Sequence, residues 1–189
     1  MIAIINQGHA PNGMPDAGAS NPITGLRESD VTFKLGNILA AYLGAAGIDA
    51  RTIQSDSLGE ICDASNEAKA DAFISLHCNS CDNDSAEGFE IYTTPGETAA
   101  DQLATAIFKQ VQATFPDMTF RTDSADGDPD KEANFYVLRN TDAPAVLIEC
   151  GFISNMQEQA NMQDEAWLDK MAAAIARGVT DWAQAQAQG

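Results

Sequence analysis

The sequence has few basic residues and no long apolar run. Its 189 residues include 10 lysines and arginines against 28 aspartates and glutamates, so the formal net charge at pH 7 is −18. Nucleic acids and anionic membranes bind clustered basic side chains, so this balance argues against both as partners. No apolar stretch approaches the ~20 residues that a helix needs to span a bilayer. Hydrophobic residues still make up 44% of the chain, which excludes a disordered acidic segment and is enough for one core.

Cysteine is also scarce, because four residues are too few for a disulfide scaffold at this length. Cys62 and Cys150 lie in apolar segments and are interpreted as small core residues. Cys78 and Cys81 form a Cys-x-x-Cys pair, which is found in redox proteins and in structural zinc sites. Cys81 leads into a polar loop, and a structural zinc site needs two further ligands. A disulfide within the pair, or two free thiols, is therefore the simpler interpretation.

Short apolar segments alternate with segments of helical periodicity along the chain. Strands are predicted at residues 2–6, 48–53, 72–76, 88–93, 135–138 and 145–149. Helices are predicted at residues 31–47, 58–69, 103–111 and 168–182, with loops at 7–29 and 116–132. This alternation predicts a single α/β domain over residues 1–189, whose end from about residue 184 is frayed or a linker. Its sheet is expected to be mainly parallel and twisted, with about six strands and helices on both faces.

The chain contains only two histidines, and each is predicted to follow a strand. His9 follows the first strand, His77 follows the third, and Glu149 ends the strand at 145–149. Ligands of open α/β sheets bind beyond the carboxyl ends of the strands, so these three side chains should share one edge. Two histidines and a glutamate around an open position can bind catalytic zinc. Glu28 precedes the first helix, where the alternative role is to stabilise the helix dipole.

Four features, in the expected order, resemble the zinc-dependent N-acetylmuramoyl-L-alanine amidases of the amidase-3 group, which cleave bacterial peptidoglycan. The first is the opening segment IAIINQGHAPNGMPDAGA, and the second is Glu28 ahead of the first helix. The third and fourth are the segments SNEAKADAFISLHCNS and VLRNTDAPAVLIECGFISN. Together they cover most of the chain, so the resemblance does not depend on one short motif.

The resemblance implies both a metal site and a reaction. His9, Glu28 and His77 match the zinc ligands of the family, and Glu149 matches its catalytic glutamate. The implied reaction is zinc-dependent hydrolysis of the amide bond between N-acetylmuramic acid and L-alanine of the stem peptide. Zinc would polarise the carbonyl group, while Glu149 would move a proton from the metal-bound water to the leaving amine.

The roles of Glu28, Asn79 and Arg139 each have an alternative. The gap in sequence before Glu28 is long for the family, so Asp16 and Asp30 are alternative carboxylates for its place. Asn79 and Arg139 are candidate substrate-binding residues, and the alternative is that they are turn or surface residues.

The expected partner is peptidoglycan, bound through its muramyl peptide, and the protein is expected to be a monomer. The N-terminus lacks the basic region and the apolar stretch of a secretory signal. Because the cell wall lies in the periplasm or outside the cell, a phage lysin released by a holin or a processed bacterial autolysin is expected. Two other functions remain as alternatives. One is a peptidoglycan-binding module that has lost turnover, and the other is a thiol redox protein based on the Cys-x-x-Cys pair.

Overall fold

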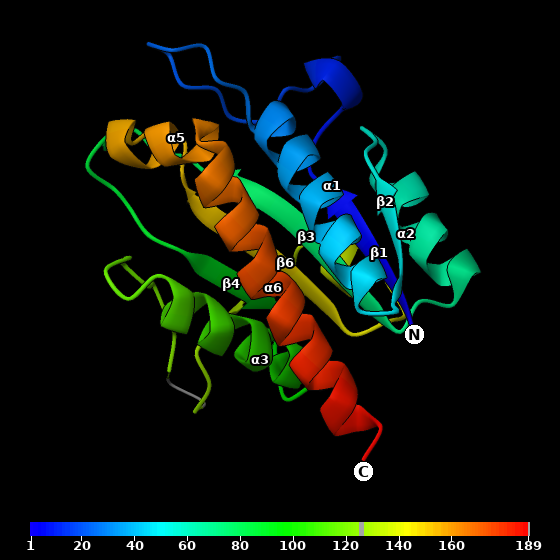
Figure 1. Cartoon of the computed structure of the whole chain (residues 1–189). Helices are drawn as coiled ribbons and strands as arrows, with labels where there is room; N and C mark the ends of the chain where they lie inside the picture. The colour runs from blue at the N-terminus through cyan, green and yellow to red at the C-terminus, as the bar shows by residue number, and fades with distance from the viewer. Residues whose placement is uncertain (125–126, 189) are drawn as a thin grey trace.

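A six-stranded sheet lies between two layers of helices (Figure 1) in the computed structural model, which describes residues 1–124 and 127–188. The strands across the sheet are, in order, β2 (Asp49–Ile53), β1 (Ile2–Gln7), β3 (Ala72–Asn79), β6 (Ala145–Phe152), β4 (Glu90–Thr93) and β5 (Lys131–Glu132). The first four are parallel, whereas β4 is antiparallel to β6 and parallel to β5. The predicted α/β class and mainly parallel sheet are confirmed.

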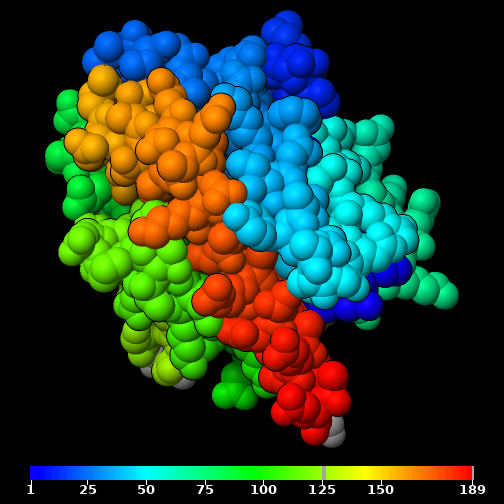
Figure 2. Space-filling view, in the orientation of Figure 1, coloured from blue at the N-terminus to red at the C-terminus, as the bar shows by residue number. Residues whose placement is uncertain are grey.

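Helices cover both faces of this sheet. They are η1 (Pro11–Gly13), α1 (Glu28–Ala45), α2 (Leu58–Ala68), α3 (Ala99–Thr114), α4 (Tyr136–Arg139), α5 (Met156–Gln163) and α6 (Glu165–Gln186). Figure 2 shows α1, α6 and α3 lying side by side over one face, and the smaller α2 and α4 pack on the other. Within the described residues, each helix is too short or too polar to cross a membrane.

The larger core lies between the sheet and the layer of α1, α3 and α6. Ile5, Ile74 and Ile148 project into it from neighbouring strands and are fully buried. A Cβ atom on Gly178 of α6 would lie 2.4 Å from the Cα atom of Ile107 on α3. Only glycine allows these two helices to approach so closely, and their contact holds the layer against the sheet.

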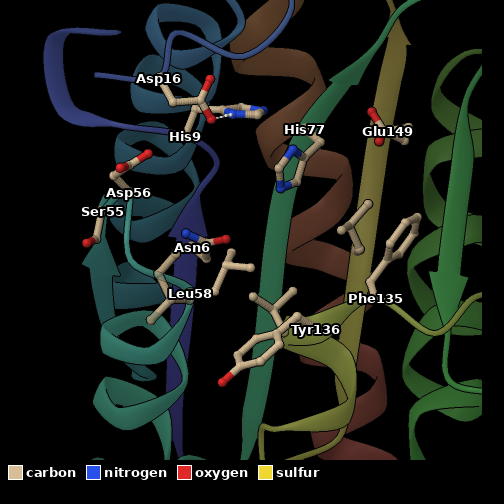
Figure 3. Close-up of a pocket in the computed structure, with 13 residues that line it drawn as sticks. Asn6, His9, Asp16, Ser55, Asp56, Leu58, His77, Phe135, Tyr136 and Glu149 are labelled. Atoms are coloured by element: carbon tan, nitrogen blue, oxygen red, sulfur yellow. Dashed lines mark hydrogen bonds and ion pairs between the residues drawn. The ribbon is translucent and has the colours of Figure 1, made fainter. Parts of the chain in front are cut away.

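The smaller core, on the opposite face, covers only part of the sheet. Ile61 of α2 and Val137 of α4 pack there against Phe73 and Leu147 of the strands. The ends of β1, β3 and β6 that carry the predicted site residues extend beyond these two short helices (Figure 3). This face of the sheet is therefore open to solvent where the site lies.

The structure corrects one predicted element. Residues 135–138 were predicted as a strand, but Tyr136–Arg139 form the one-turn helix α4. Phe135 and Tyr136 are both exposed, while Val137 and Leu138 are both buried. A strand facing a core on one side would alternate buried and exposed residues, so this pairwise pattern belongs to a helix.

Three further elements were not predicted, and one of them is the 3-10 turn η1 inside the predicted loop at 7–29. The helix α5 was missed because its sequence has few apolar residues and little periodicity. The predicted loop at 116–132 contains the short strand β5, and its residues 125–126 lie outside the described part of the chain. At the C-terminus, α6 continues to Gln186, and residue 189 is also outside the described part.

Candidate metal centre and active site

The strands that carry the site are longer than the sequence predicts. β3 continues past Leu76 to Asn79, and β6 continues past Glu149 to Phe152. His77 therefore lies within β3 rather than after it, and Glu149 lies inside β6 rather than at its end. The two residues are partners in the register of β3 and β6. Because side chains alternate along a strand, directly paired residues point to the same face of the sheet. The predicted shared edge is thus a shared face near the carboxyl ends of the strands.

Glu28, the first residue of α1, lies between the two histidines. Its Oε2 atom is 3.0 Å from Nε2 of His9, and its Oε1 atom is 2.9 Å from Nδ1 of His77. The backbone N–H groups of Ala19 and Cys78 also donate to this carboxylate, at 2.8 and 2.9 Å. One ligand atom from each of the three side chains lies within 4.8 Å of the others, so one metal ion could contact all three.

Glu28 and His9 both have shifted pKa values. Burial alone would raise the pKa of Glu28, but hydrogen bonds and charges from His77 and His9 outweigh it, so this pKa lies well below its usual value. Burial alone would lower the pKa of His9, but Glu28 and Asp16 outweigh it and raise this pKa to about 9. Glu28 is therefore ionised at neutral pH, as a carboxylate ligand must be.

The alternative carboxylates Asp16 and Asp30 have other partners. Asp16 accepts a hydrogen bond from the backbone N–H of Gly18 at 2.8 Å, and its Oδ2 atom lies 2.8 Å from Nδ1 of His9. The hydrogen bond with His9 is the main reason that the pKa of Asp16 is lowered. Asp30 instead pairs with Arg27 at 2.8 Å. Glu28 is the carboxylate that faces both histidines, and Asp16 lies behind one of them.

The backbone around the site leaves no room for larger residues. Gly18 has a φ of +67°, and a Cβ atom there would lie 2.4 Å from Cδ2 of His9 and 2.6 Å from Oε2 of Glu28. His9 itself has a φ of 67°, which is uncommon for a residue with a side chain. A non-glycine residue held in this region costs energy and is often found at functional sites.

Glu149 has the properties of a general base. Its Oε2 atom is buried and has no hydrogen-bond partner among the described residues. The pKa of Glu149 is raised to about 7, mainly by burial. The charge of His77 lowers this pKa, and the charge of Glu28 raises it. A carboxyl group with a pKa near neutrality is well matched to accepting and then returning a proton.

These side chains line one end of a cavity of about 270 Å³ (Figure 3). Figure 3 shows His9, His77 and Glu149 side by side across the strands, with Leu58 and Tyr136 farther along the same face. The other lining residues are Asn6, Asp16, Ser55, Asp56, Ile61, Phe135, Val137 and Leu147. The cavity thus joins a polar end, at the metal-ligand cluster, to an apolar end between α2 and α4.

Sequence reasoning did not single out the apolar end of this cavity. Leu58, Phe135 and Tyr136 are large side chains that remain 39–48% exposed. Their signal in the sequence is weak, because single exposed hydrophobic residues are common on protein surfaces. The fold brings them together from the start of α2 and the start of α4.

The predicted substrate-binding residues lie outside the lining of this cavity. The Nδ2 group of Asn79 donates to Oε2 of Glu90 at 3.0 Å, one strand beyond Glu149. Arg139 is exposed at the end of α4. Their contact with substrate stays a prediction.

The four cysteines are free. Cys78 is buried and Cys81 is exposed, while Cys62 and Cys150 are buried in the core as expected. Burial raises the pKa of Cys78 well above its usual value, so its thiol is a poor nucleophile.

The comparisons with known proteins agree with this geometry. The sequence profile of the N-acetylmuramoyl-L-alanine amidase family matches residues 3–181. The probable cell wall amidase LytH of Staphylococcus epidermidis is 31% identical over 183 residues, which cover 95% of this chain and 57% of that protein. The endolysin of Bacillus phage SPP1 is 31% identical over 180 residues, covering 91% of this chain and 63% of the endolysin. The chain therefore spans less than two thirds of the length of these relatives.

Two solved structures share the fold over nearly their whole length. The N-acetylmuramoyl-L-alanine amidase from Clostridium difficile 630 superposes with a TM-score of 0.85 at 26% identity, covering 98% of this chain and 97% of that one. AmiC2, the N-acetylmuramoyl-L-alanine amidase of Nostoc punctiforme, superposes with a TM-score of 0.84 at 27% identity, covering 97% of each chain. With a profile match from residue 3 to residue 181 and this shared architecture, the chain belongs to the N-acetylmuramoyl-L-alanine amidase family.

Proposed function

We propose that this protein is a zinc-dependent amidase that hydrolyses the bond between N-acetylmuramic acid and L-alanine in peptidoglycan. The observation that carries the proposal is the convergence of His9, Glu28 and His77 beside Glu149 in one open cavity. Membership of the amidase family supports the choice of reaction. The endolysin among the relatives and the probable cell wall amidase support the cell wall as the place of action.

The donor set fits zinc. Two imidazoles and one carboxylate, with a position left for water or substrate, form a ligand set of catalytic zinc sites. His9, Glu28 and His77 would hold the ion, and Asp16 would keep the His9 ring in place through its Nδ1 atom. Zinc bound there would polarise the substrate carbonyl and lower the pKa of water to about 7. The unpartnered Oε2 atom of Glu149 is the acceptor that such a water requires.

Glu149 would perform the proton transfers. Its carboxylate accepts a proton from the water molecule whose oxygen attacks the lactyl carbonyl carbon. The same carboxyl group then donates that proton to the nitrogen of L-alanine as the carbon–nitrogen bond breaks. The products are the free lactyl carboxylate and a peptide with a new N-terminal amine.

Digestion of purified sacculi tests the proposal. Zinc-loaded protein should release free N-terminal L-alanine, detected by mass spectrometry of the products, and a chelator should abolish the release. The Glu149→Gln variant should keep zinc but lose the release. If zinc-loaded protein leaves the sacculi intact while still binding them, the chain is a wall-binding module instead.

A thiol redox function is the second alternative, and it has less support. The buried position of Cys78 and the absence of a helix after Cys81 do not match a reactive dithiol. Replacing both cysteines by serine is expected to leave amide hydrolysis in place. Asn79 and Arg139 remain predicted substrate-binding residues, and a monomeric state is likewise proposed, with size-exclusion chromatography and light scattering as its test.

A further inference from the structure

One strand away from Glu149, a buried carboxylate pairs with two basic side chains. Glu90 of β4 is paired with Glu149 of β6 in the sheet register and is only 2% exposed at its side chain. Its Oε1 atom accepts hydrogen bonds from Nε of Arg121 and from Nζ of Lys131, the latter at 3.2 Å. Its Oε2 atom accepts from Asn79 at 3.0 Å and from the hydroxyl group of Tyr92 at 2.5 Å.

These four donors occupy the acceptor capacity of Glu90. A carboxylate offers about four lone-pair positions, whereas a guanidinium has five N–H donors and an ammonium has three. Arg121 and Lys131 thus carry more donors than Glu90 can accept. Their side chains are 45% and 30% exposed, so the outer part of each cation is open to solvent. The cluster itself holds two positive charges and one negative charge, and the carboxyl groups of Glu149 and Glu158 lie near it.

Aromatic rings hold both cations in place. The guanidinium carbon of Arg121 lies 5.3 Å from the centre of the Phe152 ring, and Nζ of Lys131 lies 5.4 Å from the centre of the Tyr92 ring. Such contacts stabilise a cation and limit its freedom. Because the rings already restrict both side chains, binding an anion here would cost little further side-chain entropy.

The cluster borders the proposed active site. Tyr92 is paired with Leu147 on one side and with Lys131 on the other in the sheet register, and Leu147 lines the cavity. The Phe135 ring, which also lines the cavity, packs edge-on against Tyr92 with centres 5.3 Å apart. A chain lying across the sheet from Glu149 towards β5 would therefore reach the exposed sides of both cations.

Acidic side chains lie on the opposite side of the cavity. Asp16 and Asp56 line it there, near the end of β1 and the loop between β2 and α2. In a chain with only 10 basic residues and a net charge of −18, two neighbouring cations distinguish the side of the cavity next to β4 and β5.

We propose that Arg121 and Lys131 form a subsite for a carboxylate of the stem peptide and set the direction of the substrate. This inference rests on the function proposed above. Once its lactyl carboxyl group is in the amide bond, N-acetylmuramic acid has no carboxylate, whereas the peptide ends in one and gains another with each acidic residue. The peptide then lies over β4 and β5, and the glycan lies towards Asp56 and Leu58. Arg121 and Lys131 are specificity residues in this scheme, and Glu90 positions them.

The test compares substrates that differ only in these carboxylates. The substrates are N-acetylmuramoyl-L-alanyl-glutamate, its two monoamides and its diamide, each hydrolysed by zinc-loaded protein. We expect KM for the free acid to be about tenfold lower than for the diamide, with similar kcat, because a charge-assisted hydrogen bond is lost on amidation. The two monoamides show which carboxylate is bound.

The variants separate binding of the carboxylate from support of the fold. Lys131→Met and Arg121→Gln should each reduce the preference for the acid, and the double variant should remove it while still cleaving the diamide. Lys170→Met is the matched control, because Nζ of Lys170 also lies over an aromatic ring, that of Phe115, at 4.6 Å but on the other face of the sheet. This control should keep the wild-type preference.

Two results would overturn the subsite. One is equal KM for acid and diamide in the wild-type protein. The other is an equal loss on both substrates in the Lys131→Met and Arg121→Gln variants, which would mean that the cations only compensate Glu90. If the wild-type protein cleaves neither these substrates nor sacculi, the proposed function fails. Calorimetric binding of L-alanyl-glutamate and its diamide to the wild-type and double-variant proteins then decides the subsite by itself, since preference for the acid supports it and equal binding rejects it.

Discussion

His77 and Glu149 lie directly opposite each other on the parallel strands β3 and β6. This register aligns a metal-ligand candidate with a general-base candidate on the two central strands of the sheet, where each backbone is hydrogen-bonded to a strand on both sides. The pair therefore needs no movement of a loop to be assembled. Glu28 and His9 complete the cluster from α1 and from the end of β1.

Replacing Glu149 with glutamine should separate catalysis from metal binding. The amide has nearly the same shape but cannot accept the proton, so we expect kcat to fall by about 10²–10⁴-fold. Zinc content, measured by atomic emission after dialysis, should match that of the wild-type protein. Substantial remaining activity in this variant would show that another group is the base.

Replacing Glu28 with glutamine should have the reverse primary effect. The neutral amide is a weaker ligand for zinc, and it leaves His9 and His77 without their shared carboxylate. We therefore expect a large loss of zinc affinity, together with a smaller rise of Tm on adding zinc than in the wild-type protein. Titration with a competing chelator measures the affinity, and unchanged affinity would contradict the assignment of Glu28 as a ligand.

Asp16 is expected to act through His9. The Asp16→Asn variant replaces the carboxylate at Nδ1 of His9, so the ring loses the partner that orients it, and zinc affinity should fall by about 10–100-fold. Asp30→Asn is the control, because Asp30 lies in the same part of the chain but pairs with Arg27. Equal zinc affinities in the two variants would remove the positioning role of Asp16.

Asp130 is expected to make stability depend on pH. The hydroxyl group of Thr93 donates to it at 2.6 Å and lowers its pKa, but burial and neighbouring Asp128 together raise the pKa of Asp130 to about 7. Because the folded pKa exceeds the unfolded one of about 4, the folded state binds the proton more tightly between these values. The free energy of unfolding contributed by this group therefore falls as pH rises from about 4 to about 7.

The Asp130→Asn variant removes this dependence. Its Tm should exceed that of the wild-type protein above about pH 7, and the difference should shrink towards pH 4. Asp82→Asn removes one negative charge from an exposed loop and serves as the control for net charge. A Tm difference that is constant over this pH range would contradict the prediction.

The net charge of −18 predicts an effect of salt on activity. On an anionic wall, the acidic protein is repelled, and ions at about 0.15 M screen this repulsion beyond about 8 Å. Hydrolysis of anionic sacculi should therefore rise from low to moderate ionic strength, followed as release of soluble fragments. A small uncharged muramoyl peptide amide should show no such rise, and a steady fall on sacculi would contradict the expectation.

Several features follow from local sequence alone. The apolar runs of β1, β3 and β6 predict strands buried on both faces, because consecutive hydrophobic residues without alternation suit a parallel sheet covered twice. The positions of His9, His77 and Glu149 at the ends of these runs predict that they meet at one edge. Segment 135–138 shows the limit of this reasoning, because a run of four aromatic and aliphatic residues fits either a strand or a helical turn until its burial is known.

The amino-acid sequence by itself determined the class of fold, the positions of its main strands along the chain and the side chains that could bind a metal ion, since these depend on patterns among near neighbours. Only the tertiary structure decided that Glu28 faces both histidines while Asp16 supports one of them and Asp30 faces away. It also brought Arg121 and Lys131 to the buried Glu90, 31 and 41 residues away in the chain. Such contacts depend on the register between strands and on the path of the connecting loops, which long-range packing sets.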